Sequence, residues 1–466
     1  MMKKFNLAAL VAVSMLGLVG CNTGTPATTS TTPQASEKVA AAVKDAMTLD
    51  RDALMKKAAE ELGTNKLKIL AVTSRGGKPA ALKKFHDELA KYGTVNDNPV
   101  EYSSTVDGRI YTTLAGEIES GTTGGVQGAI LQDGYQLQKK FIDTGYFTNY
   151  IPKEWKAEST TQDSDSDPFT LQFNFKTFMY NNKGLPEMKI DNIWDVTAEK
   201  YKGKLYTMDP ANENVNMDWL IQLTDDKWNN VIKDAYNDAT NDNKMDLTKF
   251  ESYGEKKYAY AWIAGFLNNA SFFGDDGKAV DALAKTPGSV GWIVYSKIQN
   301  VKETAETTKK NIVIAALGNE HSDGTNPGTS KVKGFGGFMY KHYMSIMPNA
   351  TYPYATCAFF NILSTTTEGY SAWATDVGDY PTMTTINQDR TMNGHGTLAT
   401  EANKDGIYKF TQDKTKENVF PCLNDPSSIW WNDSSKGNAV IETPSYIATY
   451  YNRVAGFINT QISNKK

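Results

Sequence analysis

Cysteine and histidine are scarce in this chain of 466 residues. It contains 3 cysteines and 4 histidines. No two cysteines have the Cys-x-x-Cys spacing that is typical of zinc or redox sites. A dense disulfide framework is therefore excluded, and a structural zinc site is not expected.

An excess of positive charge is also missing. The chain has 49 Lys and Arg against 53 Asp and Glu, which gives a formal net charge of -4. Nucleic-acid binding needs basic surface that neutralises phosphates, so nucleic acid is not an expected partner. With 40% hydrophobic residues the chain is not disordered as a whole, and its length favours two or three domains.

Long apolar runs are absent except at the N-terminus. There Lys3 and Lys4 precede an apolar run from Leu7 to Leu18. The run is too short to span a bilayer comfortably. We therefore interpret residues 1–20 as a cleaved signal peptide.

The end of this signal resembles a bacterial lipobox. The sequence Leu-Val-Gly-Cys at residues 18–21 predicts that Cys21 is acylated, for example with palmitate, and becomes the mature N-terminus. The alternative is an ordinary signal with a chance cysteine. Residues 22–36 are small, polar and rich in Pro and Thr, so we expect residues 21–47 to tether the folded part to the membrane. Whether Cys357 and Cys422 form a disulfide is left open.

Helical and strand-like patterns alternate along the rest of the chain. Residues 50–63 predict a capped amphipathic helix, residues 68–72 a buried strand and residues 79–93 a second helix. The alternation continues to residue 144 and starts again after a long strand-like run at 169–180. It predicts an α/β fold with a mostly parallel sheet wrapped by helices. Two α/β lobes joined by two extended crossovers are the simplest architecture.

Several segments in combination resemble the bacterial extracellular solute-binding proteins of ABC importers. The likeness is to the two-lobed class that includes iron(III), polyamine and phosphoglycerate-type binders. Its strongest part is TFMYNNKGL followed by IDNIWDVTAEKYKGKLYTMDPANEN, at residues 177–185 and 190–214. GAILQDGYQLQKKFIDTGYF at 128–147 and YPTMTTI at 380–386 add to it.

The resemblance implies a two-lobed periplasmic-binding-protein fold of type 2 with two hinge crossovers. Residues 48–170 together with 316–466 are expected to form the first lobe, and residues 171–315 the second. The role of the stretch after about residue 390 is left open, because the resemblance does not extend to it.

Candidate ligand contacts follow predicted strands, where ligands of open α/β sheets bind. Arg75 lies on a glycine loop whose amides could receive an anionic or carbonyl group, and it could pair with a carboxylate. Each candidate also has a purely structural interpretation: Arg75 as a solvated turn residue, and the aspartates as helix caps, which is favoured for Asp276. The proposed ligand-binding residues are Ser74, Arg75, Gly76, Asp133, Tyr135, Asp209, Asn212, Asn214 and Asp276.

Metal ligands are not expected. Iron(III) binders of the resembled class carry adjacent tyrosines, but the corresponding strand here, residues 291–295, has one tyrosine, and Tyr450-Tyr451 lies near the C-terminus. Residues 238–249 are similar to a calcium loop but lack its turn glycine and its final glutamate. The pair Trp430-Trp431 is interpreted as packing and not as a ligand cage.

The sequence thus predicts a non-enzymatic, lipid-anchored, extracytoplasmic receptor that delivers a small polar solute to an ABC permease. We expect a monomer without a cofactor. No activated-nucleophile motif is present, so an extracellular carbohydrate-active enzyme is a weaker alternative. A surface lipoprotein with an adhesive or structural role is the other alternative.

Overall fold

The computed structural model describes residues 36–465 except 106, 123, 159, 160, 162, 301–311, 316–319, 322–331, 375–377 and 388–438. The predicted signal peptide, Cys21, Cys422 and Trp430-Trp431 lie outside the described residues.

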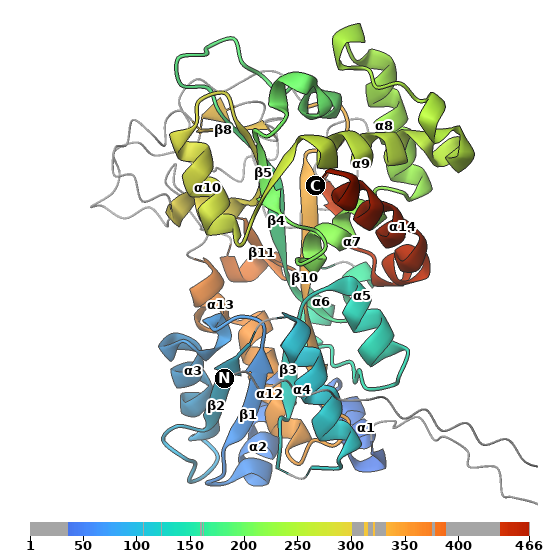
Figure 1. Cartoon of the computed structure of the whole chain (residues 1–466). Helices are drawn as coiled ribbons and strands as arrows, with labels where there is room; N and C mark the ends of the chain where they lie inside the picture. Colours follow the sequence, from blue (N-terminus) through green and yellow to red (C-terminus); the bar gives the residue numbers. More distant parts are fainter. Residues whose placement is uncertain are drawn as a thin grey trace, which may run out of the picture. The chain divides into compact units, whose positions relative to one another are not determined.

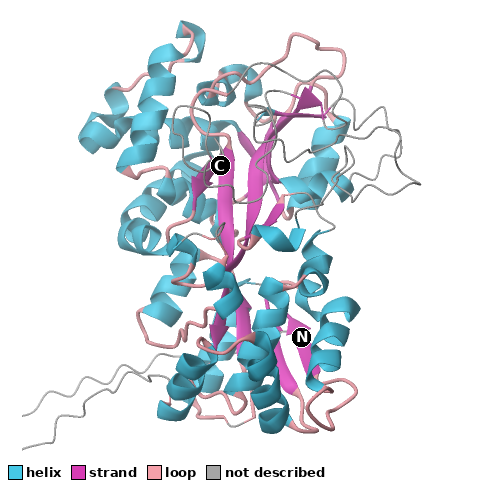
Figure 2. Ribbon diagram, turned by 180° about the vertical axis from the view of Figure 1, so that it is seen from behind, coloured by secondary structure: helices cyan, strands magenta, loops and turns pink. Residues whose placement is uncertain are grey.

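Helices and strands alternate as the sequence predicts (Figures 1 and 2). The described α-helices are α1 (Glu37–Ala46), α2 (Arg51–Leu62), α3 (Pro79–Leu89), α4 (Asp107–Glu119), α5 (Gly134–Leu137), α6 (Lys153–Ala157), α7 (Asn214–Gln222), α8 (Asp226–Asp238), α9 (Lys257–Asn269), α10 (Asp276–Lys285), α12 (Pro353–Thr365), α13 (Thr367–Ala374) and α14 (Pro444–Lys465). The described strands are β1 (Leu67–Ala71), β2 (Val100–Ser104), β3 (Gly128–Leu131), β4 (Thr170–Asn181), β5 (Leu205–Met208), β6 (Ala270–Phe273), β7 (Val290–Val294), β8 (Ile312–Ile314), β9 (Glu320–His321), β10 (Gly337–Ile346), β11 (Asp379–Pro381) and β12 (Ala439–Ile441).

The described strands form one continuous mixed sheet in the order β2-β1-β3-β10-β4-β7-β5-β6. β1 is parallel to β2 and β3, and β5 is parallel to β6 and β7. β4 and β10 are antiparallel to each other and to their outer neighbours, β7 and β3. The prediction of a mostly parallel sheet is therefore correct for the two ends and wrong for the middle, because the chain runs through the two central strands in opposite directions.

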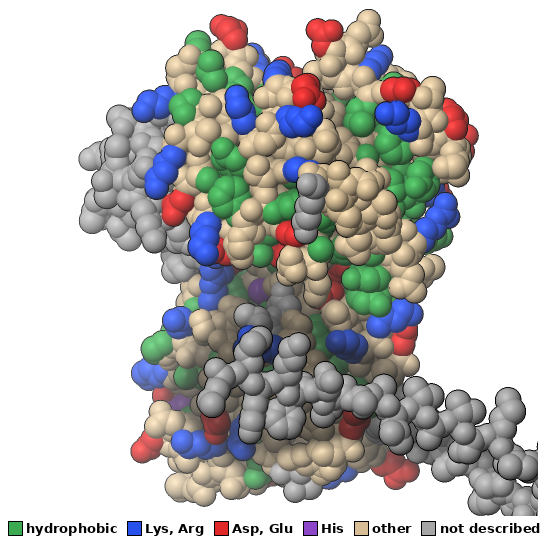
Figure 3. Space-filling view, in the orientation of Figure 1, with side chains coloured by type: hydrophobic (Ala, Val, Ile, Leu, Met, Phe, Trp, Pro, Cys, Tyr) green, Lys and Arg blue, Asp and Glu red, His purple; other side chains and the backbone are tan. Residues whose placement is uncertain are grey.

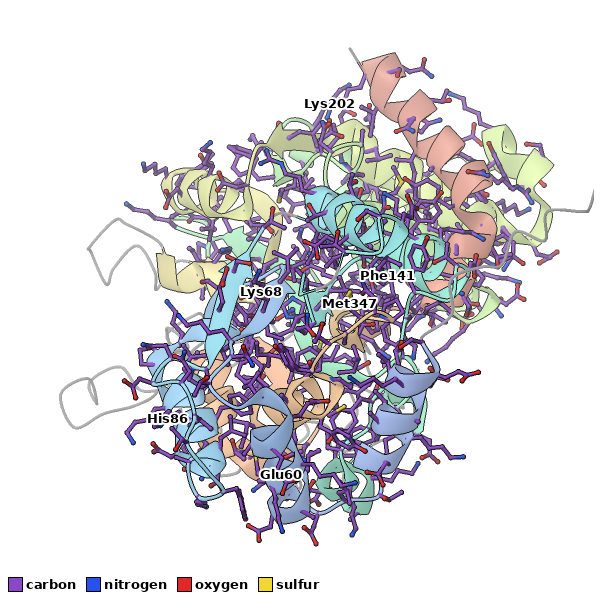
Figure 4. The ribbon with its side chains drawn as sticks, turned by 90° about the horizontal axis from the view of Figure 1, so that it is seen from below. Glu60, Lys68, His86, Phe141, Lys202 and Met347 are labelled. Carbon is purple, nitrogen blue, oxygen red and sulfur yellow. The ribbon has the colours of Figure 1, made fainter. Side chains whose placement is uncertain are left out.

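The first half of the fold is built around β1, β2 and β3. Helices α1, α2, α3, α12 and α13 cover one face of these strands, with Leu54, Phe85 and Phe359 among their buried side chains. A separate apolar cluster around α4, α5 and the π-helical turn that follows α5 includes Phe141 and Met347. Both side chains point inward in Figure 4.

The second half of the fold is built around β5, β6 and β7. Its larger apolar cluster joins α7, α8, α9 and α14, and in it Trp219 stacks on Trp292 with ring centroids 3.8 Å apart. A smaller cluster lies under α10. All seven tryptophans in the described chain are buried, so they form core and not a stacking pocket.

The chain passes between the halves through β4 and β10. Every residue of both strands is buried, which explains the long strand-like run at residues 169–180. After α13 and β11 the chain reaches the second half again: β12 pairs with β10, and Val454, Ile458 and Ile462 of α14 belong to the cluster of Trp219. The sequence assigned residues 444–465 to the first lobe. It also assigned residues 37–46 to the tether, which is wrong, because they form α1 and bury Val39 and Val43 in the first half. The other boundaries stay a prediction.

Two further observations concern cysteine and the membrane. Cys357 is buried on α12 and forms no disulfide within the described residues, and Cys422, with which a disulfide was left open, lies outside them. None of the described helices combines the length and the apolarity needed to cross a bilayer.

Candidate functional site

A buried row of polar side chains lies in the middle of the sheet, where β4 passes between the halves. Gln172, Asn174 and Lys176 occupy alternate positions of β4, so their side chains share one face. In the neighbouring strands His342 is opposite Gln172, and Asp379 is opposite Asn174. All five are buried. We call these five residues the hinge face.

The amides of the hinge face bind a neutral imidazole. Gln172 Nε2 lies 3.0 Å from His342 Nδ1, and His342 Nε2 lies 3.0 Å from Gln132 Oε1. Gln172 also donates to Asn174 Oδ1 at 2.9 Å. Burial and the nearby Arg75 charge lower the pKa of His342 to about 3, so the ring is neutral at physiological pH. Asn174 Nδ2 also lies 2.9 Å from His342 Nε2. A proton on Nε2 suits the contacts with Gln172 and Gln132, whereas the contact with Asn174 Nδ2 needs Nε2 as the acceptor.

Arg75 reaches the hinge face from the loop after β1. Its guanidinium donates to the carboxylate of Asp379, whose side chain is 3% exposed. The predicted anion-binding amides of this loop are used within the structure: Gly77 N donates to Ser74 O, and Lys78 N to Arg75 O. The Tyr102 ring packs so closely on Gly76 and Gly77 that a Cβ at Gly76 would lie 2.7 Å from Tyr102 Oη. The amides of Gly77 and Lys78 therefore stabilise the turn, and ligand contacts of Ser74 and Gly76 stay a prediction.

Lys176 is the one cation of the hinge face itself. Its ammonium lies 3.3 Å from Asp276 Oδ2 at the start of α10 and 3.7 Å from Glu213 Oε2 at the start of α7. Glu213 and Asp275 cap these two helices. The capping that the sequence favoured at Asp275-Asp276 is therefore present, and Asp275 provides it.

Some of these buried polar atoms lack a hydrogen-bond partner among the described residues. They are Gln172 Oε1, Lys176 Nζ and Asp276 Oδ1. A buried polar atom without a partner typically costs about 1–3 kcal/mol. The hinge face thus offers an amide acceptor and a cation, and Asp276 of α10 adds a carboxylate acceptor next to Lys176.

A second polar group joins the two halves beside the hinge face. Asp133 caps α5 through Gln136 N and accepts from Asn214 Nδ2 of α7 at 2.5 Å. Asp218 of α7 accepts from Tyr135 N at 3.2 Å, and Glu442 accepts from Gly134 N at 3.1 Å. Asp133 has a φ of 79°, which is unusual for a residue other than glycine. The capping interpretation of Asp133 and its contact with Asn214 are therefore both present.

Asp209 and Asn212 are placed differently from the other candidates. Asp209 accepts from Ala211 N at 2.9 Å and from Asn212 Nδ2 at 3.1 Å. These bonds close a local turn before α7. In the structure this pair stabilises the turn, and a ligand contact there stays a prediction.

The tyrosines considered for iron do not converge. Tyr295 is buried in the apolar cluster under α10. Tyr450 is 41% exposed on α14, whereas Tyr451 stacks on Tyr135 with ring centroids 3.5 Å apart. Within the described residues no group of three or more His, Cys, Asp or Glu side chains is arranged to hold a metal ion.

None of the five residues of the hinge face was predicted from the sequence. Of the residues around it, the sequence identified Arg75, Asp133, Tyr135, Asn214 and Asp276. The missed residues are Gln172, Asn174, Lys176, Asp218, His342, Asp379 and Glu442. A signal was present for three of them, since polar letters alternate with aromatic ones in LQFNFKTF at residues 171–178.

Charge is interspersed on the surface. In Figure 3 basic and acidic side chains alternate over the visible face, and neither sign forms a continuous patch there.

Comparisons with solved structures identify this architecture. HitA from Pseudomonas aeruginosa, described as iron-bound, matches with a TM-score of 0.51 at 11% identity, over 85% of this chain and 99% of that chain. IdiA (FutA) from Trichodesmium, in complex with iron and citrate, gives 0.49 at 11% identity over 85% and 99%. The spermidine/putrescine transporter substrate-binding protein PotD from Streptococcus pneumoniae gives 0.49 at 12% identity over 86% and 99%.

No protein-family profile matches the chain, and no curated protein matches it. The fold is therefore established by structural likeness. The mixed sheet, the two central antiparallel strands and the match to HitA agree with the resemblance found in the sequence. The chain has the two-lobed, type 2 periplasmic-binding-protein fold.

Proposed function

We propose that this protein is an extracytoplasmic solute receptor. It captures a small polar solute at the hinge face and delivers it to an ABC permease, and acylated Cys21 anchors it to the membrane. The observation that carries this proposal is a set of buried polar atoms that make no hydrogen bond within the described residues. They are Gln172 Oε1 and Lys176 Nζ on one face of β4, and Asp276 Oδ1 on α10, whose other carboxylate oxygen is ion-paired with Lys176. A solute that supplies a donor and an acceptor would satisfy them.

The location of the hinge face supports capture by closure. Arg75 belongs to the first half, Asp276 to the second, and β4 connects the two. A solute that touches all three binds the closed arrangement better than an open one. Its binding energy therefore shifts the population towards closure.

The donor set supports a polar organic solute and not iron. HitA and FutA are described with iron, and PotD as a spermidine/putrescine binder. Hard ferric iron needs several anionic oxygens at one point. The hinge face instead combines two amides, a neutral imidazole and ion-paired groups, which suit hydroxyl, amide, carboxylate or ammonium groups.

Native mass spectrometry of freshly purified full-length protein tests the proposal. We expect a retained mass of a small molecule, and we expect the identified compound to raise the melting temperature of stripped protein. Absence of any retained ligand, together with no thermal shift across sugars, amino acids, polyamines and carboxylates, would contradict solute capture. That outcome would favour a surface lipoprotein without transport.

A matched pair of variants locates the binding site. Gln172→Met keeps the side-chain volume but removes the buried amide, so we expect affinity for the retained compound to fall about 10-fold or more. Gln138→Met is the control, because Gln138 makes its bond to Asp143 at the surface. Equal affinities of both variants and the wild type in calorimetry would remove the site from the hinge face.

A further inference from the structure

Three carboxyl groups meet where α5 of the first half contacts α7 and the start of α14 in the second. Asp133 and Asp218 are fully buried, and Glu442 is 1% exposed. Each makes a bond across this junction: Asp133 to Asn214, Asp218 to Tyr135 N, and Glu442 to Gly134 N. The three carboxyls are the acidic groups through which α5 is hydrogen-bonded to the second half.

The junction is short of positive charge. The ammonium that acts on Glu442 is that of Lys341 on β10, which already pairs with Asp165 at 3.0 Å. Asp218 Oδ1 is buried and has no hydrogen-bond partner within the described chain. An ionised carboxylate with an unpartnered oxygen in such a place is costly, whereas a protonated carboxyl can donate to a neighbouring carboxylate.

The groups around the junction also favour the protonated form of Asp218. The titratable groups facing the junction are Asp133 and Tyr135 near α5, Asp218 on α7, Lys341 and Tyr343 on β10, Glu442 after β12, and Tyr451 on α14. Burial, and then the charges of Asp133 and Glu442, hold the pKa of Asp218 well above its usual value. Burial also raises the pKa of Glu442, although Tyr343 and Lys341 oppose this shift.

We propose that Asp133, Asp218 and Glu442 form a proton-dependent latch that fastens α5 to the second half of the fold. A proton shared between Asp133 and Asp218 keeps the junction bonded. Loss of this proton places two adjacent buried charges beside Glu442 and loosens the contact of Tyr135 with α7. The latch would make closure, and therefore solute retention, stronger in acidic surroundings. This goes beyond solute capture, because it concerns a property of the protein without solute.

The sign of the pH dependence follows from proton binding. A carboxyl whose pKa is raised in the bonded state takes up a proton when the contact forms, so the contact is fully stabilised at low pH. The stabilisation is lost as the pH rises through the raised pKa. The change therefore begins above about pH 4, the ordinary value of an aspartate.

Hydrogen exchange of the solute-free, full-length protein tests the latch, because two of its bonds use backbone amides. We would follow the peptide around Gly134 and Tyr135 from about pH 5 to about pH 8, with rates corrected for intrinsic exchange. We expect wild-type protection to fall about 10-fold or more as the pH rises, and protection in Asp218→Asn to stay constant. The amide in that variant mimics the protonated acid.

Glu61→Gln is the matched control, since Glu61 is another carboxyl with a raised pKa but bonds only within the first half, to Ala355 N at 3.0 Å. We expect it to keep the wild-type pH response at Gly134 and Tyr135. If Asp218→Asn does not fold, Glu442→Gln replaces it and should show a smaller response than wild type. The latch would be overturned if hydrogen-exchange protection at Gly134 and Tyr135 were independent of pH in the wild type. It would also be overturned if this protection fell with pH in Asp218→Asn, or in its replacement Glu442→Gln, as much as in the wild type. Neither result depends on whether a solute binds.

Discussion

At the scale of single residues, the ion pair between Arg75 and Asp379 leads to two predictions, one about stability and one about solute affinity. Arg75→Ala leaves Asp379 buried without its cation, so we expect the free energy of unfolding to fall by roughly 3 kcal/mol. The ion pair with Asp379 also holds the guanidinium of Arg75 at the hinge face. We therefore expect solute affinity to fall about 10-fold or more in calorimetry.

A second substitution separates these two effects. In Arg75→Ala/Asp379→Asn the uncompensated charge is gone, so we expect much of the stability to return in urea unfolding while binding stays weak. Binding that recovers along with stability would show that Arg75 acts only through folding. Unchanged affinity in Arg75→Ala alone would remove it from the site.

The residues that the sequence did and did not identify differ in their surroundings. Asp133 and Asn214 were predicted because each lies close to the end of a strand or the start of a helix, where local pattern is informative. Lys176 and His342 lie inside fully buried strands, where a polar side chain has no local explanation. Asp218 is on a helix with all of its residues after Asn214 buried, so periodicity could not mark it.

At the scale of elements, local rules were sufficient for most boundaries. α2 begins after the cap Asp50 and ends before Gly63, which has a φ of 53°, and both signals were visible in the sequence. β6 was missed because Ala270–Phe273 follows α9 directly without a turn signal. The alternation expected up to residue 144 does not end in one regular helix there, since α5 passes into a π-helical turn at Gln138.

The packing of α2 on α12 should depend on pH through one side chain. Burial raises the pKa of Glu61 to about 7, although it accepts from Ala355 N. Between about pH 4.5 and about pH 7 the Glu61 carboxyl is therefore neutral in the folded protein but ionised in the unfolded chain. The stability that it contributes is therefore complete below about pH 4.5 and is lost as the pH rises through about 7.

Substitution isolates this contribution. We expect Glu61→Gln to abolish it and to raise the melting temperature at about pH 8 relative to wild type, by the equivalent of on the order of 1–2 kcal/mol. At about pH 4.5 the two proteins should melt alike. Calorimetry that shows parallel pH profiles for both proteins would contradict a buried, neutral Glu61.

At the scale of the whole chain, function depends on contacts between distant segments. The hinge face combines alternate residues of β4 with His342 and Asp379, and Arg75 reaches it from the loop after β1. Only the order of the strands brings these segments together. The sequence predicted an α/β fold with crossovers because alternation is local information. It could not place α14 with the second half, because that contact joins residues more than 200 positions apart.

Anchoring is the property of the whole chain that remains to be tested. If Cys21 carries the acyl chains, Cys21→Ser removes the attachment, and we expect the protein to move from the membrane fraction to the soluble fraction of bacteria that process lipoproteins. Cys357→Ser is the control, since Cys357 is buried on α12 and is closed to acylation. Persistence of Cys21→Ser in washed membranes would contradict lipidation. In that case the apolar run at residues 7–18 would have to be retained as the anchor, and mass spectrometry of the N-terminal peptide would detect it.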